Sequence, residues 1–155
     1  MNSEFDSKHK IDFTRWIETE RVVIGLRKDG VLHVYYKSQT SIDKDFQHWL
    51  LIAYNYVTEG KKYPFIIEGG EFVEVKKEGK EYLEEIQEEV PIISNAILVN
   101  NTAQLILASF FIKFAKIELE MKIFKDFDKA LEWSLKQKVK FEQNELENQS
   151  STLMD

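Results

Sequence analysis

The side chains most able to carry acid–base or nucleophilic chemistry are few in this chain and far apart. Its histidines are His9, His33 and His48, and it has no cysteine. None of the three belongs to a His-Glu-x-x-His spacing or has an evident nucleophile beside it. We therefore interpret them as structural residues. We expect no catalytic site, no metal and no cofactor, so that the protein is not an enzyme.

A glycine pair is the second place where the sequence invites a chemical interpretation. Gly69 and Gly70 follow a short apolar segment typical of a strand, which is where a phosphate-binding loop would begin. Neither Gly-x-Gly-x-x-Gly nor a Walker-type Gly-Lys-Ser/Thr continues from them, so a turn is the better interpretation. The lack of cysteine also excludes disulfides and thiolate metal sites, and it is compatible with a reducing compartment.

Composition predicts one globular domain. The chain has 155 residues, of which 43% are hydrophobic and 31% charged, and its formal net charge is -6. That sign argues against duplex nucleic acid as a partner, because such binders need clustered lysine and arginine. The first ten residues, MNSEFDSKHK, lack the apolar stretch of a secretory signal. We therefore expect a cytoplasmic protein.

The negative charge is concentrated in residues 71–90, which hold eight glutamates and three lysines. The helical segment 78–89 within this stretch is expected to present an acidic outer face. Two interpretations stay open. The face can simply be solvated and aid solubility, or it can dock a basic partner, with electrostatic attraction accelerating the encounter.

An apolar segment, residues 102–116, contrasts with the charged remainder of the chain. Its longest near-continuous apolar run, Leu105 to Ile112, is far shorter than the ~20 residues that a membrane-spanning helix needs, so we expect no transmembrane segment. At ~100° per residue Thr102, Ser109, Lys113 and Lys116 fall on one narrow stripe. We therefore expect a core helix covered from more than one side by the sheet and by other helices. A partner or a lipid-like ligand on its remaining face stays open.

Strands and helices are expected to alternate after an initial hairpin. That order is typical of an α/β fold with a mostly parallel, mixed sheet covered by helices. Residues 19–138 would form this domain, residues 1–18 an N-terminal arm or extra strand, and residues 139–155 a polar, flexible tail. The expected elements are a hairpin over 21–37, helices over 41–60, 78–90, 102–116 and 127–138, and strands over 63–70, 92–100 and 121–126.

The order of elements resembles that of STAS domains, including the SpoIIAA-like proteins. The resemblance runs from about residue 20 to 137 and rests on "PFIIEGGEFVEVKKEGKEYL", on the strand-to-helix passage Lys122–Phe127, and on "ALEWSL" at 130–135. The chain looks closest to small bacterial members of unassigned function. The resemblance implies a STAS/SpoIIAA-like fold with the N-terminal hairpin followed by alternating helices and strands.

The regulatory signature of that family can be matched residue by residue. Phosphorylated STAS antagonists carry an Asp-Ser-Ser/Thr-Gly turn before the helix that follows the central strand, and the matching residues here are Lys76 to Gly79. The glycine is kept, but Lys77 stands in place of the phosphoacceptor serine. The resemblance therefore implies no phosphorylation switch there, although it implies partner binding at this turn and helix. The expected partner-binding residues are Gly69, Gly70, Lys76, Lys77, Glu78, Glu81, Glu84 and Glu85.

The leading hypothesis is therefore a non-enzymatic, cytoplasmic protein-interaction or regulatory module, with an unknown and basic protein as its partner. The alternative is a carrier of a small apolar or lipid-like ligand held beside the helix 102–116, in a cavity near Phe110, Phe111 and Phe114. A homodimer is also open, since Tyr54 and Tyr56, with Leu51, could form a dimer face on the first helix.

Overall fold

The computed structural model describes residues 7–154 and contains a six-stranded mixed sheet against which the helices pack. Four of its strands are parallel to one another. The two strands that come first in the chain extend the sheet at one edge through antiparallel pairing. The α/β class with a mixed, mostly parallel sheet is confirmed. The strands, in their order across the sheet, are β1 Phe13–Glu18, β2 Val22–Arg27, β3 Leu32–Tyr36, β5 Tyr63–Gly69, β7 Ile92–Leu98 and β8 Glu120–Phe124.

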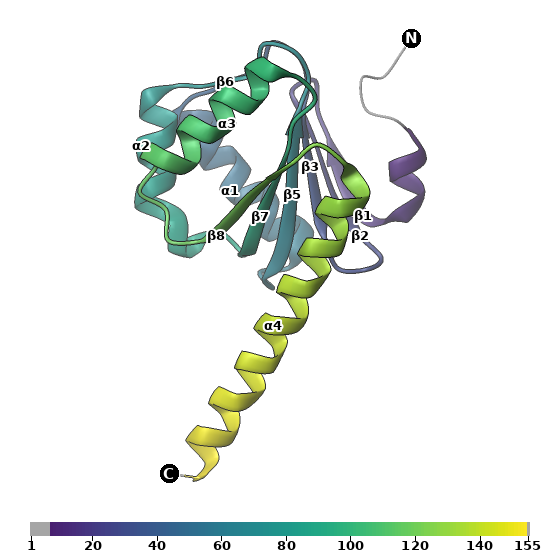
Figure 1. The fold of residues 1–155 in the computed structure, drawn as a ribbon, viewed down its shortest axis with the longest axis vertical. Helices are drawn as coiled ribbons and strands as arrows, with labels where there is room; N and C mark the ends of the chain where they lie inside the picture. Colours follow the sequence, from purple (N-terminus) through teal and green to yellow (C-terminus); the bar gives the residue numbers. More distant parts are fainter. Residues whose placement is uncertain (1–6, 155) are drawn as a thin grey trace.

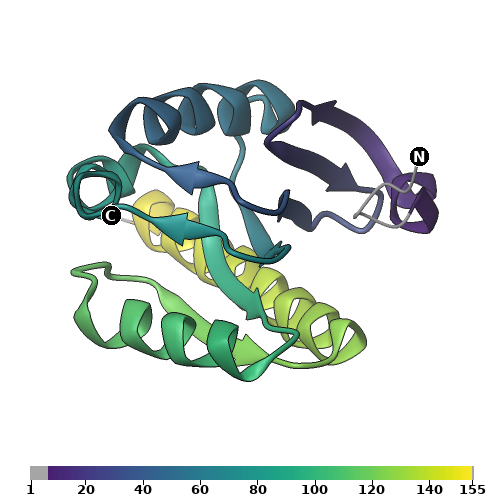
Figure 2. The same cartoon turned by 90° about the horizontal axis from the view of Figure 1, so that it is seen from above.

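Four α-helices cover this sheet (Figure 1). Three of them, α1 Lys44–Thr58, α2 Lys77–Ile86 and α3 Thr102–Phe114, lie on one face, and α4 Phe127–Met154 packs on the other. Figure 2 views the same arrangement from the edge where the parallel strands end. The short elements are the 3-10 helices η1 Ser7–Asp12 and η2 Gln87–Glu89, and the two-residue strands β4 Ser41–Ile42 and β6 Glu74–Val75, which pair with each other.

Local signals in the sequence account for where these elements begin and turn. The Asp43 carboxylate accepts a hydrogen bond of 2.8 Å from the Phe46 N–H and caps α1. Asn101 caps α3 in the same way, through the Gln104 N–H at 2.8 Å. In the β2–β3 turn, Gly30 has a φ of +83°, which a residue with a side chain rarely adopts.

The main core lies between the sheet and α1. Leu32, Val34 and Tyr36 of β3 point to this face and pack on Phe46 and Leu50 of α1. A smaller core lies beneath α4 on the opposite face, with fully buried Val31, Ile66, Ala96 and Ala130. Both faces of the central strands are therefore apolar, as expected for parallel strands with helices on each side.

The two ends of the described chain form different elements, a strand near the amino end and a long helix at the carboxyl end. The predicted extra strand is β1, which pairs with β2 at one sheet edge, whereas residues 1–6 of the predicted arm lie outside the described residues. At the other end, α4 does not stop near residue 138 but continues to Met154. Its last turns project beyond the sheet in Figure 1 and are exposed, so the predicted tail is helical over 139–154.

The expectation that the apolar helix is a core helix is wrong. Ala108 is the one buried residue of α3. The reason is that α3 packs over β8, the edge strand, while α2 packs against α1, so within residues 7–154 no helix packs closely on the other side of α3. Four of its large apolar side chains are more than half exposed: Ile106 (51%), Leu107 (59%), Phe110 (57%) and Phe114 (56%).

The packing of α2 beside α1 depends on a close backbone approach at Gly79. A Cβ atom added there would lie 2.3 Å from the carbonyl oxygen of Ile42 in β4. We expect Gly79→Ala to lower the free energy of unfolding by about 1–3 kcal/mol through overpacking, although alanine is the better helix former.

Urea unfolding measures this difference. Lys77→Ala, which is exposed in the same helical turn, is the control and should change the free energy of unfolding by no more than about 0.5 kcal/mol. A neutral or stabilising Gly79→Ala would mean that α2 is not held against β4.

Candidate functional site: a cleft between α2 and α3

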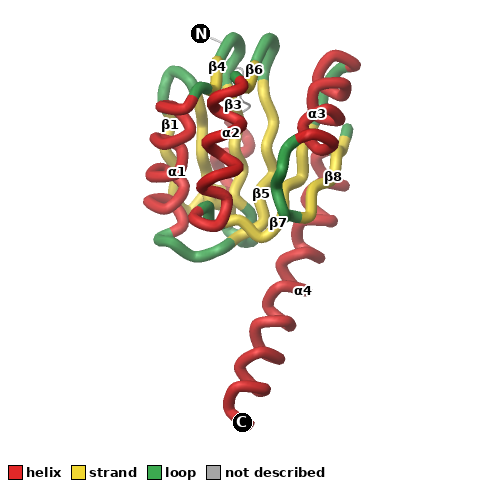
Figure 3. Tube along the Cα trace, turned by 90° about the vertical axis from the view of Figure 1, so that its left-hand side faces the viewer, coloured by secondary structure: helices red, strands yellow, loops and turns green. Residues whose placement is uncertain are grey.

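A cleft of about 1890 Å³ opens between α2 and α3. Figure 3 shows α1 and α2 side by side, with α3 standing apart from them and β5 visible in between. β5, β7 and β8 form the floor of this cleft, α2 one wall and α3 the other. The acidic segment and the apolar segment of the sequence are therefore opposite walls of one site.

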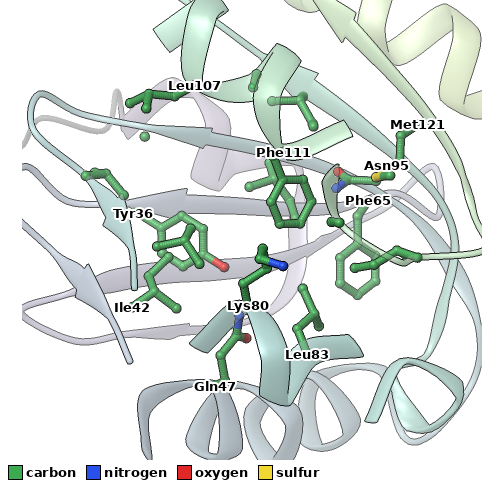
Figure 4. A pocket seen from close by; sticks show the side chains of 18 of the residues that line it. Tyr36, Ile42, Gln47, Phe65, Lys80, Leu83, Asn95, Leu107, Phe111 and Met121 are labelled. Carbon is green, nitrogen blue, oxygen red and sulfur yellow. The ribbon is translucent and has the colours of Figure 1, made fainter. Parts of the chain in front are cut away.

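The α3 wall is apolar. Leu107, Phe110 and Phe114 project along one side of the helix and line the cleft, and the rings of Phe110 and Phe114 stack with their centroids 5.5 Å apart. Phe111, deeper in the cleft, points over the floor in Figure 4. This wall leaves large hydrophobic side chains in contact with water, which is the usual mark of a binding surface.

The α2 wall and the rim are acidic. Eight glutamates and three lysines line the cleft in all. Lys80 reaches into it from α2, but its ammonium group is paired with the Glu84 carboxylate at 3.2 Å. Glu85 and Glu88 are exposed and have no ion pair among residues 7–154. The surplus of negative charge along this wall is therefore not neutralised within the described chain.

The floor contains one polar side chain without a partner. Asn95, on the central strand β7, is 8% exposed, and its Oδ1 atom has no hydrogen-bond partner within the described part of the chain. It lies beside Phe65 of β5 and Met121 of β8, with which it is paired across the sheet (Figure 4). A buried amide that lacks a partner costs free energy. The cleft thus offers an occupant one hydrogen-bonding position in an apolar floor.

Hydrogen bonds bridge both ends of the cleft. At the amino end of α3, Gln104 Nε2 donates to the carbonyl oxygens of Gly69 and Gly70 at 3.1 and 3.2 Å. At the other end, the Lys116 N–H donates to Glu84 at 2.6 Å and the Glu118 N–H donates to Gln87 at 2.9 Å. The hydrogen bond from Lys116 is also the main reason why the pKa of Glu84 is lowered. These bridges leave the outward side, between the two helices, as the way in.

Two tyrosines close the side of the cleft towards the main core. The hydroxyl groups of Tyr36 and Tyr54 lie 3.0 Å apart and both side chains are buried. Burial raises the pKa of Tyr36 to about 12 and raises that of Tyr54 well above its usual value. Since Tyr54 is a core residue, the dimer face predicted to include it on α1 is wrong in that respect, whereas Tyr56 is exposed.

The structure divides the eight predicted partner-binding residues into two groups. Gly69, Gly70, Glu84 and Glu85 line the cleft. Lys76, Lys77, Glu78 and Glu81 are exposed at the start and on the outer face of α2 and do not line it. The sequence interpretation missed Asn95, although one asparagine inside the apolar strand "IISNAILV" was a visible signal.

The histidines have structural contacts. His33 is fully buried with its Nε2 atom 3.3 Å from the Glu68 carboxylate, and His48 lies 2.8 Å from the Tyr82 hydroxyl. Within residues 7–154 there is no cluster of three or more histidine, aspartate or glutamate side chains that could hold a metal. Over the same residues, none of the helices has the length and hydropathy to cross a bilayer.

One family model matches the chain, over residues 24–138. Its description is "Domain of unknown function (DUF7793)". The chain belongs to that family. Both walls and the floor of the cleft lie inside the matched residues, so the site is part of the family domain rather than of the flanking segments. No curated protein and no solved structure matches this sequence.

The hydrogen-bonded bridge at the carboxyl end of α3 can be tested by amide hydrogen exchange. Glu84→Ala removes the acceptor for the Lys116 N–H, and an amide that has lost its hydrogen-bond acceptor exchanges with solvent more readily. We expect the Lys116 amide to exchange at least about tenfold faster. Glu85→Ala, one position along, should leave that rate unchanged. Equal effects of both variants would contradict the bridge.

The buried tyrosine pair predicts a loss of stability in alkali. Both hydroxyls keep their protons in the folded state, whereas tyrosines in the unfolded chain lose theirs above about pH 10. The unfolded state then binds fewer protons, so the free energy of unfolding falls by up to about 1.4 kcal/mol per pH unit for each tyrosine above that pH, and does not change on their account below it.

Urea unfolding between about pH 8 and about pH 11 measures this slope. Tyr36→Phe combined with Tyr54→Phe should flatten it, since phenylalanine carries no proton to lose. Tyr56→Phe, at an exposed position of α1, is the control and should keep the slope of the unmodified protein. An unchanged slope in the double variant would rule out the pair as its source.

Proposed function

We propose that this protein is a non-catalytic, cytoplasmic protein-interaction module of STAS-like fold, and that the cleft between α2 and α3 is where its partner binds. The observation that carries the proposal is the exposed apolar side of α3. Leu107, Phe110 and Phe114 lie together on it, and large contiguous apolar surface on a soluble domain is typical of a docking site.

The shape of the site supports a macromolecular partner over a small ligand. Pockets for small molecules have volumes of roughly 300–1000 Å³ and enclose 70–90% of the ligand surface. This cleft is larger, at about 1890 Å³, and Phe110 and Phe114 on its wall stay more than half exposed. A partner that presents side chains to an open, elongated surface suits these dimensions.

The STAS-like part of the proposal rests on the order of elements. A hairpin is followed by alternating helices and strands, and α2 begins at the place where that family binds partners. Lys77 occupies the position of the phosphoacceptor, so binding is not regulated by phosphorylation of a hydroxyl group at that position. The cytoplasmic location is supported by the absence of cysteine, which suits a reducing compartment.

A second candidate function is the carriage of an apolar or lipid-like ligand. Asn95 favours it, because one hydrogen-bonding side chain in an apolar floor is typical of ligand pockets. The presence of Phe110, Phe111 and Phe114 among the lining residues agrees with this candidate as well.

Photo-crosslinking from inside the cleft tests the proposal and separates the two candidates. A photoreactive phenylalanine analogue placed at Leu107 should form a covalent adduct with one discrete protein in the cells that make this chain. Leu146 is the matched control, because it has a similar exposure (65% against 59%) but lies on α4 away from the cleft.

The captured protein must then bind the unmodified chain when both are purified, and binding must be weakened by Phe110→Ser. An adduct of a few hundred daltons at Leu107, with no protein attached, would favour the ligand carrier instead. Adducts that are identical from Leu107 and Leu146 would contradict a specific site between α2 and α3.

A further inference from the structure

The two walls of the cleft differ in polarity, and this difference indicates the chemistry of a segment that could bind between them. One wall is apolar, through Leu107, Phe110 and Phe114, and the other is acidic, through Glu85 and Glu88. The two walls face each other across the floor of the cleft. An occupant that satisfies both must be apolar along one side and positively charged along the other.

We propose that the partner segment is a basic amphipathic α-helix that lies between α2 and α3. Its apolar side packs on α3 and the floor, and its lysine or arginine side chains face Glu85 of α2 and Glu88 of η2. This inference rests on the proposed function and adds the chemistry of the partner. Helix-in-groove recognition is a recurring mode for such segments, which bind through apolar anchors at i, i+3 or i+4, and i+7.

The dimensions of the cleft suit a short helix. The walls are helices of 10 and 13 residues, so they are roughly 15–20 Å long at a rise of 1.5 Å per residue, and a partner helix of three to four turns matches them. A helix about 10 Å across occupies roughly 120 Å³ per residue. The cleft volume of about 1890 Å³ is therefore of the size needed for such a segment.

The charge of the site decides between a basic and an acidic helix. Eight of the lining side chains are glutamates and three are lysines, and Glu84 already neutralises the lysine that reaches furthest in, Lys80. An acidic segment would face the unpaired carboxylates of Glu85 and Glu88 across a short distance and be repelled. A basic segment would neutralise them and would approach faster at low ionic strength.

Asn95 gives the floor a single polar position under the apolar side of the helix. A buried asparagine at one core position of a helical interface fixes register, because any other alignment leaves it without a hydrogen bond. Its unpartnered Oδ1 atom predicts that the bound helix has one polar side chain among its apolar anchors. We therefore expect binding to depend on the position of that polar residue.

Binding of defined peptides to the full-length chain tests the inference. The probe is a fluorescent peptide of about 14 residues with leucines and one central asparagine on one helical face and lysines on the other. Three further peptides are compared by anisotropy: one with glutamate for every lysine, one with glutamine for every lysine, and one of the same composition in scrambled order. We expect the basic amphipathic peptide to bind at least tenfold more tightly than the other three.

A matched pair of charge reversals places the binding site. Glu85→Lys with Glu88→Lys should weaken the basic peptide at least tenfold. Glu145→Lys with Glu147→Lys makes the same change in net charge on the exposed end of α4 and should leave affinity within about twofold, since these charges lie outside the cleft. Raising salt from about 50 to about 500 mM should weaken binding to the unmodified chain.

Other outcomes overturn the inference. Equal binding of the basic and glutamine peptides would mean that the cleft takes a helix without reading its charge, which leaves the proposed function intact. Tighter binding of the glutamate peptide, or of the scrambled one, would also refute a basic amphipathic partner. Equal weakening by the α2 and α4 reversals would place the peptide outside the cleft. Failure of all four peptides would overturn the inference, while the crosslinks from Leu107 would still decide the proposed function separately.

Discussion

The rest of the site depends on the packing of α3, which contacts the sheet along only one of its sides. On one face of the sheet α4 packs across β5, β7 and β8. On the opposite face α1 covers the hairpin strands, α2 leans on α1, and α3 packs over the edge strand β8. Within residues 7–154, no helix covers the part of β5 and β7 between α2 and α3, and that gap is the cleft.

The same constraint explains why opposite kinds of side chain face each other. The wall from α2 belongs to an amphipathic helix whose buried residues pack in the core beside α1, and three of its charged residues, Lys80, Glu84 and Glu85, line the gap. The wall from α3 belongs to a helix with apolar residues on most sides, of which β8 covers only one. The hydrogen bond from Gln104 to the Gly69 carbonyl oxygen ties α3 to the end of β5, and the one from the Lys116 N–H to Glu84 ties the segment after α3 to α2.

The order of elements could be predicted from the sequence because each boundary has a local cause. Asp43 caps α1, Asn101 caps α3, and Gly30 turns the first hairpin, and each acts through its own backbone neighbours. The packing of α3 could not be predicted in this way. Apolar residues around a helix show that it avoids water, but they do not show whether the domain or a partner provides the cover.

The cleft itself depends on features that leave little trace in a single sequence. The position of α2 is fixed by the contact of Gly79 with Ile42 and by two strands of two residues each, which are too short to produce a periodic pattern. The acidic and apolar segments were each recognised in the sequence, whereas their meeting across the floor at Asn95 is set by the strand order. An interaction module with a basic partner is the leading hypothesis from the sequence, and this cleft is the candidate site in which to test it.

The central claim is that the apolar side of α3 is open to solvent in the free protein. Because the chain has no cysteine, single cysteines placed on α3 can be labelled with a maleimide without interference. Leu107→Cys should react about as fast as the exposed control Leu146→Cys, and Ala108→Cys, one residue further along α3, should be strongly protected. Protection of Leu107→Cys to the level of Ala108→Cys would show that the domain covers this side of the helix itself, and would contradict an open cleft between α2 and α3.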